Sequence, residues 1–389
     1  MARRNRTAAA KAEQKQDAAP PAPETIMRLT VPGAALRAAL ATCRRGIDSG
    51  TVHPILNNFL FELDDGVLSV TGADLQTRIS VAIPGAEADN ILSFLLPPRV
   101  AAVLATSAAE KIRFELDSAF GLRTTADRRS IAAATAMADD FPTMPPGPED
   151  DRYFDLSPAA IAAILQVEPL VAESHTRKSG LSIVSTVKDF SAAGGGDSSM
   201  ARARVDSCGL WSASISCEHA DLLRALNPKQ TARIAKHGSN LWIKQGAMTL
   251  VLRTLDASAH DYERFFDECR VQREGTIGKD ELVAAVKALA AIEPEDRRLT
   301  LLIASNLLTL RAKGPHGSVE ELVPCEWNAQ ATEINLSTKL LSQALAVVRD
   351  ERPRFSLRGR KNELEAFGLR DESGVEVLVA PMGYPKDLS

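Results

Sequence analysis

The chain has 389 residues, a formal net charge of −4, 45% hydrophobic residues and 25% charged residues. This composition is typical of a soluble globular protein with buried cores, and the length predicts roughly two to four domains. The net charge disfavours a nucleic-acid-binding protein that is basic over its whole surface. It still allows a basic channel inside an acidic shell, because binding depends on where the charges lie.

The cysteines predict a reducing compartment. There are five, an odd number, and no two have Cys-x-x-Cys spacing, which disfavours a disulfide framework and a zinc site. No apolar run approaches the roughly 18 residues of a membrane-spanning helix, and the N-terminus lacks the apolar core of a signal peptide. We therefore expect a cytoplasmic protein without membrane association.

Residues 1–26 form a segment rich in Ala, Pro, Gln, Lys and Arg. Such a segment buries too little apolar surface to offset the entropy of ordering, so we expect a disordered tail. Its basic residues could contact DNA or an acidic partner, or could simply be solvated.

A short apolar strand followed by a helix recurs along the rest of the chain. The first copy, Leu29–Leu40, has a strand-like start, a Pro-Gly break, and then Leu36 and Leu40 at helical spacing. An interval of roughly 60 residues predicts a strand-rich unit that carries one helix, and six such units predict three domains of two units each. The later openers lie at Leu95, Leu156, Ile215, Ile277 and Ile334.

The first domain is expected over residues 27–150. Phe59–Leu63 and Val67–Thr71 alternate apolar residues around Asp64-Asp65-Gly66, which predicts a β-hairpin with a tight turn. A proline-rich stretch at 141–148 ends this domain.

The second domain is expected over 151–272 and the third over 273–382, followed by an extension at 383–389. Helices are predicted near 157–167, 218–226, 279–291 and 337–348, and the glycine-rich segment 192–199 predicts a hairpin tip. The fold class is α+β, with each domain an antiparallel sheet backed by two helices. Further strands are predicted at 181–187, 201–205, 232–236, 240–244, 249–254 and 368–380.

No catalytic or cofactor motif is present. The sequence lacks a Walker loop, Gly-x-Gly-x-x-Gly, Gly-x-Ser-x-Gly and His-Glu-x-x-His, and its six histidines have no metal-ligand spacing. Glycines 194–196 are expected to be a bare loop, without phosphate contact. We therefore expect no enzyme activity, cofactor or metal, although an unrelated α+β enzyme remains an alternative.

Basic residues occur on most of the predicted helices. If the helices line one surface, these charges would face a common polyanion, and a phosphate backbone is the obvious one. A solvated helix face is the simpler interpretation of any single residue, and the third helix has almost no basic residue. The candidate DNA-binding residues are Arg37, Arg99, Arg224, Lys287 and Lys339.

Several ordered motifs resemble the bacterial sliding clamp family, the beta subunit of DNA polymerase III. The resemblance runs from Met27 to Met382, and each motif is weak alone but specific in this order. The motifs are His53-Pro-Ile-Leu-Asn-Asn58, Leu68–Leu75, Phe141-Pro142, Val205–Leu210, Asp261-Tyr262, Ile334-Asn335 and Val379-Ala-Pro-Met382.

The resemblance implies three alike clamp domains per chain and two chains closed head to tail into a ring. Helices would line the hole, and the ring would encircle double-stranded DNA without reading its sequence. The function implied is that of a processivity factor in DNA replication, a non-catalytic part of the polymerase holoenzyme. The implied partners are a second copy of the chain, the polymerase III alpha subunit, the clamp loader and other clamp-motif proteins.

The resemblance also implies a partner-peptide pocket on the second domain near its junction with the third. Ser207 stands where the family usually has Gly, His260 where it usually has Pro, Gly209 where it usually has Arg, and Ala380 where a larger residue is common. The preference of the pocket for the usual peptide motif is therefore open. The pocket residues implied are Arg177, Leu181, Val205, Ser207, Leu210, His260, Phe265, Leu378, Ala380 and Met382.

The implied dimer interface joins the first domain around Ile131 and Ala133 to the third domain near Ile292. Glu218-His219 occupies the place of a basic pair at the start of the fourth helix, which would weaken phosphate attraction. These departures suggest a divergent or accessory copy. The alternative is a clamp-fold scaffold that binds proteins but holds DNA weakly.

Overall fold

The structure is a computed structural model, which describes residues 23–47, 53–64, 66–91, 93–136, 138–143, 146–172, 180–196, 198–255, 262–292, 298–314, 317–360 and 363–382. The expected tail over residues 1–26 therefore lies mostly outside the described residues, and the extension at 383–389 lies wholly outside them. The chain forms three sheet-dominated domains with few helices.

The first domain holds two helices and a set of antiparallel strands. Helix α1 buries Leu36, Ala39 and Leu40, whose spacing places them on one face. The β2–β3 hairpin turns at Gly66, whose φ of +75° favours glycine. The elements are β1 (Thr25–Pro32), α1 (Gly33–Cys43), η1 (Arg44–Gly46), η2 (Pro54–Asn57), β2 (Phe59–Asp64), β3 (Val67–Ala73), β4 (Thr77–Pro84), β5 (Glu87–Ala88), β6 (Phe94–Leu96), α2 (Pro98–Ala105), β7 (Lys111–Asp117), β8 (Gly121–Ala126) and β9 (Arg129–Ala134).

The second domain repeats this plan with a longer first helix, which contains Pro169. Its elements are η3 (Asp150–Arg152), β10 (Phe154–Leu156), α3 (Pro158–Ala172), β11 (Gly180–Ser185), β12 (Asp189–Gly195), β13 (Ser199–Asp206), β14 (Trp211–Ser216), α4 (Cys217–Ala220), η4 (Asp221–Ala225), β15 (Ala232–His237), β16 (Asn240–Gln245), β17 (Met248–Arg253) and α5 (Tyr262–Glu268).

The third domain repeats the plan again. Ser337 caps α7 by accepting a hydrogen bond from the amide of Leu340. Its elements are β18 (Arg270–Ile277), α6 (Lys279–Ile292), β19 (Arg298–Ala304), β20 (Leu307–Gly314), β21 (Gly317–Trp327), β22 (Thr332–Ser337), α7 (Thr338–Val347), β23 (Arg354–Arg360), β24 (Glu363–Arg370) and β25 (Val375–Val379).

Neighbouring domains share continuous sheets. Strand β17 of the second domain pairs with β4 of the first, with Leu250 opposite Ile79. Strand β13 of the second domain pairs with β25 of the third, with Ala201 opposite Val377. Backbone hydrogen bonds therefore run across both domain boundaries, which stiffens the whole chain.

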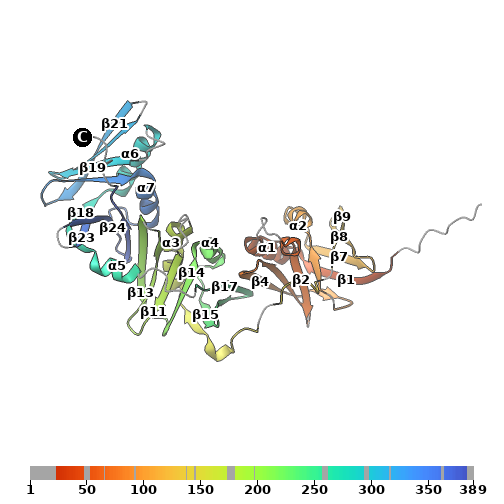
Figure 1. Cartoon of the computed structure of the whole chain (residues 1–389). Coiled ribbons are helices and arrows are strands. Elements are labelled where there is room, and N and C mark those ends of the chain that lie inside the picture. The colour runs from red at the N-terminus through yellow and green to blue at the C-terminus, as the bar shows by residue number, and fades with distance from the viewer. Residues whose placement is uncertain are drawn as a thin grey trace, which may run out of the picture.

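The three domains follow one another along a bent line (Figure 1). Helices α1 and α2, α3 and α4, and α6 and α7 lie on the inner side of the bend, whereas the sheets form its outer side. The six openers in the sequence therefore correspond to helices that share one side of the molecule.

The helices near 157–167, 279–291 and 337–348 form as predicted, as does the hairpin. The predicted helix at 218–226 is instead divided into the single turn α4 and the 3-10 segment η4. Helix α5 has no counterpart among the predicted helices.

The hairpin tip predicted at 192–199 forms between β12 and β13, but it is shorter than predicted because strand occupies both ends of the segment. Residues up to Gly195 complete β12, and the turn is confined to the few residues before Ser199. The expectation of a bare loop at glycines 194–196 is therefore wrong for the first two. A Cβ on Gly194 would lie 2.5 Å from a methyl carbon of Val171, so this glycine lets α3 pack closely on the strand.

Candidate functional site

Three of the candidate DNA-binding residues are exposed on the inner helices. Arg99 lies on α2, Lys287 on α6 and Lys339 on α7, and each side chain is exposed. These three helices share the inner side of the bend (Figure 1), so the three cations belong to one layer of helices.

The other two candidates are bound within the protein. Arg37 is half-buried on α1, and its Nη1 donates a hydrogen bond to the carbonyl oxygen of Ala109 at 3.0 Å. Arg224 on η4 donates from Nε to Oε2 of Glu168 at 2.6 Å. Both guanidinium groups therefore have internal acceptors, which weakens the sequence argument for them as free phosphate ligands.

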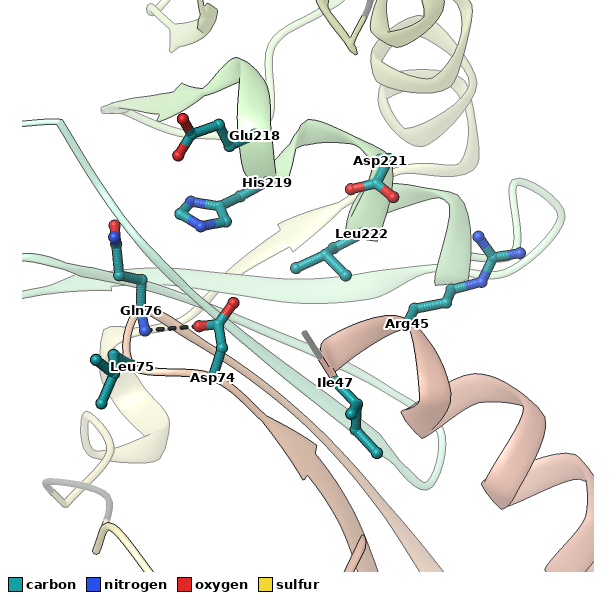
Figure 2. A pocket seen from close by; sticks show the side chains of 9 residues that line it. All are labelled: Arg45, Ile47, Asp74, Leu75, Gln76, Glu218, His219, Asp221 and Leu222. Atoms are coloured by element: carbon teal, nitrogen blue, oxygen red, sulfur yellow. Dashed lines mark hydrogen bonds between the residues drawn. The ribbon is translucent and has the colours of Figure 1, made fainter. Parts of the chain in front are cut away.

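A cavity of about 450 Å³ lies on the helical side of the junction between the first and second domains. His219 and Leu222 point into it from the second domain, and Asp74 lies opposite on the first domain, where it accepts a hydrogen bond from the amide of Gln76 (Figure 2). The lining is acidic on balance, so this stretch of the inner side does not favour phosphate. The lining residues are Arg45, Ile47, Asp74, Leu75, Gln76, Glu218, His219, Asp221 and Leu222.

The altered pair at the start of the fourth helix has two different environments. Glu218 is exposed, whereas His219 is only 7% exposed and its Nδ1 lies 2.9 Å from Oγ of Ser216. Neither side chain supplies the fixed positive charge that the resemblance would place there.

Two of the residues implied for the partner pocket meet in one apolar cluster. Phe265 of α5 packs with Leu378 of β25 at the junction of the second and third domains. This cluster is separate from the main core and includes residues from both domains. Its other members are Met200, Phe266, Cys269 and Ala366.

The remaining implied pocket residues differ widely in exposure. Leu181 is fully buried and Val205 packs against the main core, so neither forms an open wall in this structure. Leu210 is 69% exposed, and Ala380 and Met382, which follow β25, are half-buried. Arg177 and His260 lie outside the described residues.

The loop from Ser207 to Leu210 is held by local contacts. The hydroxyl of Ser207 donates to the carbonyl of Thr186, and Gly209 has a φ of +100°. A Cβ on Gly209 would lie 2.5 Å from the ring of Phe154, so both backbone and packing require glycine here. This explains why an arginine, expected from the resemblance, does not occupy the position.

An ion network joins α5 to the strands beneath it, and it was not predicted from the sequence. Arg202 of β13 donates to Glu263 at 3.0 Å and Asp267 at 3.1 Å on α5, and to Glu376 of β25 at 2.5 Å. Arg358 of β23 donates to the other oxygen of Glu376 at 3.0 Å. The network therefore ties α5 to strands of both the second and third domains.

Three residues of the network, Arg202, Arg358 and Glu376, are almost completely buried, whereas Asp267 at its margin is exposed. Arg202, Arg358 and Glu376 are 6%, 4% and 7% exposed, and the guanidinium of Arg202 lies 4.5 Å from the ring centre of Phe266. Burial alone would raise the pKa of Glu376, but the hydrogen bonds from Arg202 and Arg358 hold it below its ordinary value. One feature of the sequence indicates this network, because Glu376 is a charged residue within the otherwise apolar strand β25.

Two strand edges are relevant to assembly. Among the described residues, β9 pairs only with β8, and the Gly317–Pro324 part of β21 pairs only with β20. Ile131 and Ala133 of β9 are half-buried against the core, and Ile292 is half-buried at the end of α6. The open edges lie on the first and third domains, where the sequence predicts the dimer interface.

Within the described ranges, no group of three or more His, Cys, Asp or Glu side chains is arranged to hold a metal ion. The helices described there are also too short or too polar to span a membrane.

Residues 27–145 match the family model of the DNA polymerase III beta subunit, N-terminal domain. A search of curated proteins found no match to the sequence. The sequence-based resemblance is thus supported independently for the first domain.

Solved structures extend the likeness to nearly the whole chain. The beta subunit of Thermotoga maritima DNA polymerase III superposes with a TM-score of 0.83 at 19% identity, over 92% of this chain and 100% of that one. The Pseudomonas aeruginosa beta subunit superposes at 0.81 with 20% identity, over the same shares. A Pseudomonas aeruginosa sliding clamp bound to griselimycin gives the same values.

The family model supports the resemblance for the first domain, and the solved structures confirm the three-domain clamp fold over 92% of the chain.

Proposed function

We propose that this chain, which has the fold of the DNA polymerase III beta subunit, is a DNA sliding clamp. In this proposal two copies close head to tail around duplex DNA and tether the replicative polymerase. The work is topological and requires no catalytic residue. It would take place in the cytoplasm, where bacterial replication occurs.

One observation carries the proposal. Two helices from each of the three domains lie on the inner side of the bend (Figure 1), and Arg99, Lys287 and Lys339 are exposed on three of these six helices. A second copy would complete a ring whose inner wall is helical. Few and exposed cations suit a clamp, because loose phosphate contacts permit sliding while the closed ring prevents escape.

The open strand edges support the ring closure. The turn and start of β9 carry Arg128 and Arg129, whereas β21 carries Glu320 and Glu321, so the two edges have opposite charge. Leu322 on β21 is 56% exposed and could be covered by the partner edge. An unpaired strand edge is a ready template for pairing with another chain.

The Phe265–Leu378 cluster supports a partner site at the second junction. A short peptide with apolar residues would bury part of this cluster and the exposed Leu210. The partners proposed are the polymerase III alpha subunit, the clamp loader and other proteins with a clamp motif. Whether the pocket accepts the usual motif depends on the altered residues around Ser207 and Gly209.

Two measurements test the proposal. Sedimentation should give twice the 41.8 kDa chain mass. Protein loaded onto nicked circular DNA should stay bound through gel filtration and be lost when a single cut linearises the circle. Equal retention on circular and linear DNA, or none on either, would contradict the clamp function.

The second candidate function is a protein-binding scaffold with weakened DNA retention. The acidic cavity at the first junction and the pairing of Arg224 with Glu168 favour it. A dimer that binds clamp-motif peptides but is not retained on loaded circles would support the scaffold and exclude the clamp.

A further inference from the structure

Glu168 is a buried carboxylate in the inner helical layer. Its side chain is 1% exposed on α3, and its Oε2 lies 2.6 Å from Nε of Arg224. Arg224 belongs to η4, and its side chain is 48% exposed. The pair therefore joins a fully buried anion to a cation that still reaches the surface.

The carboxylate of Glu168 is incompletely satisfied. Among the described residues its Oε1 has no hydrogen-bond partner, and burial raises the pKa of Glu168 even though Arg224 acts to lower it. A buried carboxylate with a missing partner costs stability, and a neutral side chain of the same size would cost less. Fold stability alone therefore does not explain an acid at this position.

We propose that Glu168 restrains the attraction of the clamp for DNA by holding Arg224 in an ion pair, away from the phosphate backbone. The inference rests on the proposed clamp function, because Arg224 can contact phosphate only if DNA lies on the inner, helical side of the bend. Glu168 is a positioning residue, since it is buried and would act only through Arg224.

The surroundings of the pair act in the same direction. Asp221, on the same 3-10 segment as Arg224, and Glu218 line the neighbouring cavity, together with Asp74 of the first domain. Arg45 is the cation in that lining. Each acid lowers the local positive potential, so this part of the channel would hold phosphate more weakly than the part around Arg99.

Paired and unpaired arginines differ in their contribution to DNA binding. A guanidinium held 2.6 Å from a carboxylate adds little net charge, and a phosphate must compete with that carboxylate for it. A free guanidinium can neutralise one phosphate, which changes the slope of log affinity against log salt by about 0.9. The salt slope therefore reports whether Arg224 takes part.

The test uses the full-length dimer and four proteins: the wild type, Glu168→Gln, Arg224→Ala and the double variant. Affinity for a short linear duplex is measured by fluorescence anisotropy between about 50 and 200 mM salt. We expect Glu168→Gln to bind roughly fivefold tighter, as for one added hydrogen bond, with a slope steeper by about 0.9. Arg224→Ala alone should bind DNA with nearly the wild-type affinity. In the double variant, Arg224→Ala should abolish the gain in affinity that Glu168→Gln produces.

The double variant separates positioning from simple charge removal. If Glu168→Gln binds tighter whether or not Arg224 is present, the effect is general electrostatics and the proposal is overturned. If Glu168→Gln binds DNA with the wild-type affinity and salt slope, the proposal for Glu168 is overturned. The clamp function is then still supported if the protein is retained on circular DNA. If the wild type shows no salt-dependent binding and no retention, both proposals fall.

Two further variants serve as controls, one for poor folding of Glu168→Gln and one for the general effect of removing a negative charge. Glu168→Met removes the charge with a side chain of similar length, and it should reproduce the gain if Glu168→Gln is poorly folded. Glu62→Gln removes the same charge from an ion pair between strands, where Arg78 lies 3.1 Å away, and it should leave the salt slope unchanged. A gain in Glu62→Gln equal to that of Glu168→Gln would count against positioning.

Discussion

Arg202 of β13 and Glu376 of β25 form a buried ion pair of 2.5 Å across the seam between the second and third domains. The seam is already joined by backbone pairing, with Arg202 directly opposite Glu376 in the register. Arg202 also binds two of the three acids of α5, Glu263 and Asp267, so this helix is fixed to the β13–β25 pairing through these side chains while Phe265 packs in the apolar cluster. The shape of the proposed partner site therefore depends on this charge network.

Glu376→Gln should destabilise the protein strongly. The change leaves Arg202 and Arg358 buried without their shared counter-charge, and breaking a buried ion pair typically costs about 3–5 kcal/mol. Urea unfolding followed by circular dichroism measures the loss. The control is Glu326→Gln, whose partner Arg352 is exposed, and it should cost no more than about 1 kcal/mol.

The same carboxylate predicts an acid dependence of stability. Because the pKa of Glu376 is lower in the folded state, its contribution is present above the ordinary value of 4.5 and is lost as the pH falls through the folded value. The wild type should therefore lose stability below about pH 4.5 more steeply than Glu376→Gln. Melting temperatures across this range would show parallel curves if the network were not responsible.

The helices were predictable because each begins after a strand opener and has apolar residues at helical spacing, as in Leu36 and Leu40 of α1. Helix α5 was not predictable, because its sequence Tyr-Glu-Arg-Phe-Phe-Asp-Glu has no apolar stripe at helical spacing. Its acids bind Arg202 and its aromatic residues pack in the cluster with Leu378, and both partners are distant in sequence. The strand at Gly194 was also not predictable, because the glycine is required by its close contact with Val171, which is distant in sequence. Local patterns thus predict elements, whereas the network and the close approaches depend on tertiary contacts.

Arg37 and Arg224 show why the sequence alone does not predict which cations are available to DNA. The sequence places a cation on a helix, but whether it is available depends on a carbonyl from Ala109 or a carboxylate from Glu168. Neither acceptor is near in sequence, so charge counting alone overstates the basic lining.

Gly209→Ala should disturb the loop that carries Leu210. The φ of +100° strains any Cβ, and the ring of Phe154 occupies the space that the methyl group needs. We expect a loss of about 1–3 kcal/mol and faster amide exchange in the loop. Gly238→Ala is the matched control, since its φ is also positive but nothing lies within 4 Å of the added carbon, so it should cost less.

Leu210→Ala and Phe265→Ala should both abolish binding of a clamp-motif peptide and leave the dimer intact. Leu210 is 69% exposed, so its truncation should not change the unfolding free energy, whereas Phe265 also packs on the α5 cluster and should cost some stability. Calorimetric titration of the peptide and sedimentation of each variant measure the two effects. Dissociation of the dimer by Leu210→Ala would mean that the pocket is misplaced.

Arg99→Ala should weaken DNA binding modestly and leave stability unchanged. Arg99 is exposed at the start of α2, so it can contribute one phosphate contact and a change of about 0.9 in the salt slope. Arg37→Ala is the contrasting variant, because it removes a hydrogen bond to Ala109 and should lower stability before it affects DNA. Anisotropy with a short duplex and thermal melting distinguish the two, and a larger DNA effect from Arg37→Ala would reverse the assignment.

Leu322→Lys should convert the dimer into monomers without unfolding the chain. Leu322 is 56% exposed on the open edge of β21, so a lysine there is solvated in the monomer but would be buried beside the partner edge. Sedimentation at several concentrations should show the 41.8 kDa species, while the melting curve of the monomer stays cooperative. Val187→Lys is the control, because Val187 is 86% exposed in the second domain and should not affect assembly. A Leu322→Lys protein that still sediments as a dimer would exclude β21 from the interface and require another edge to close the ring.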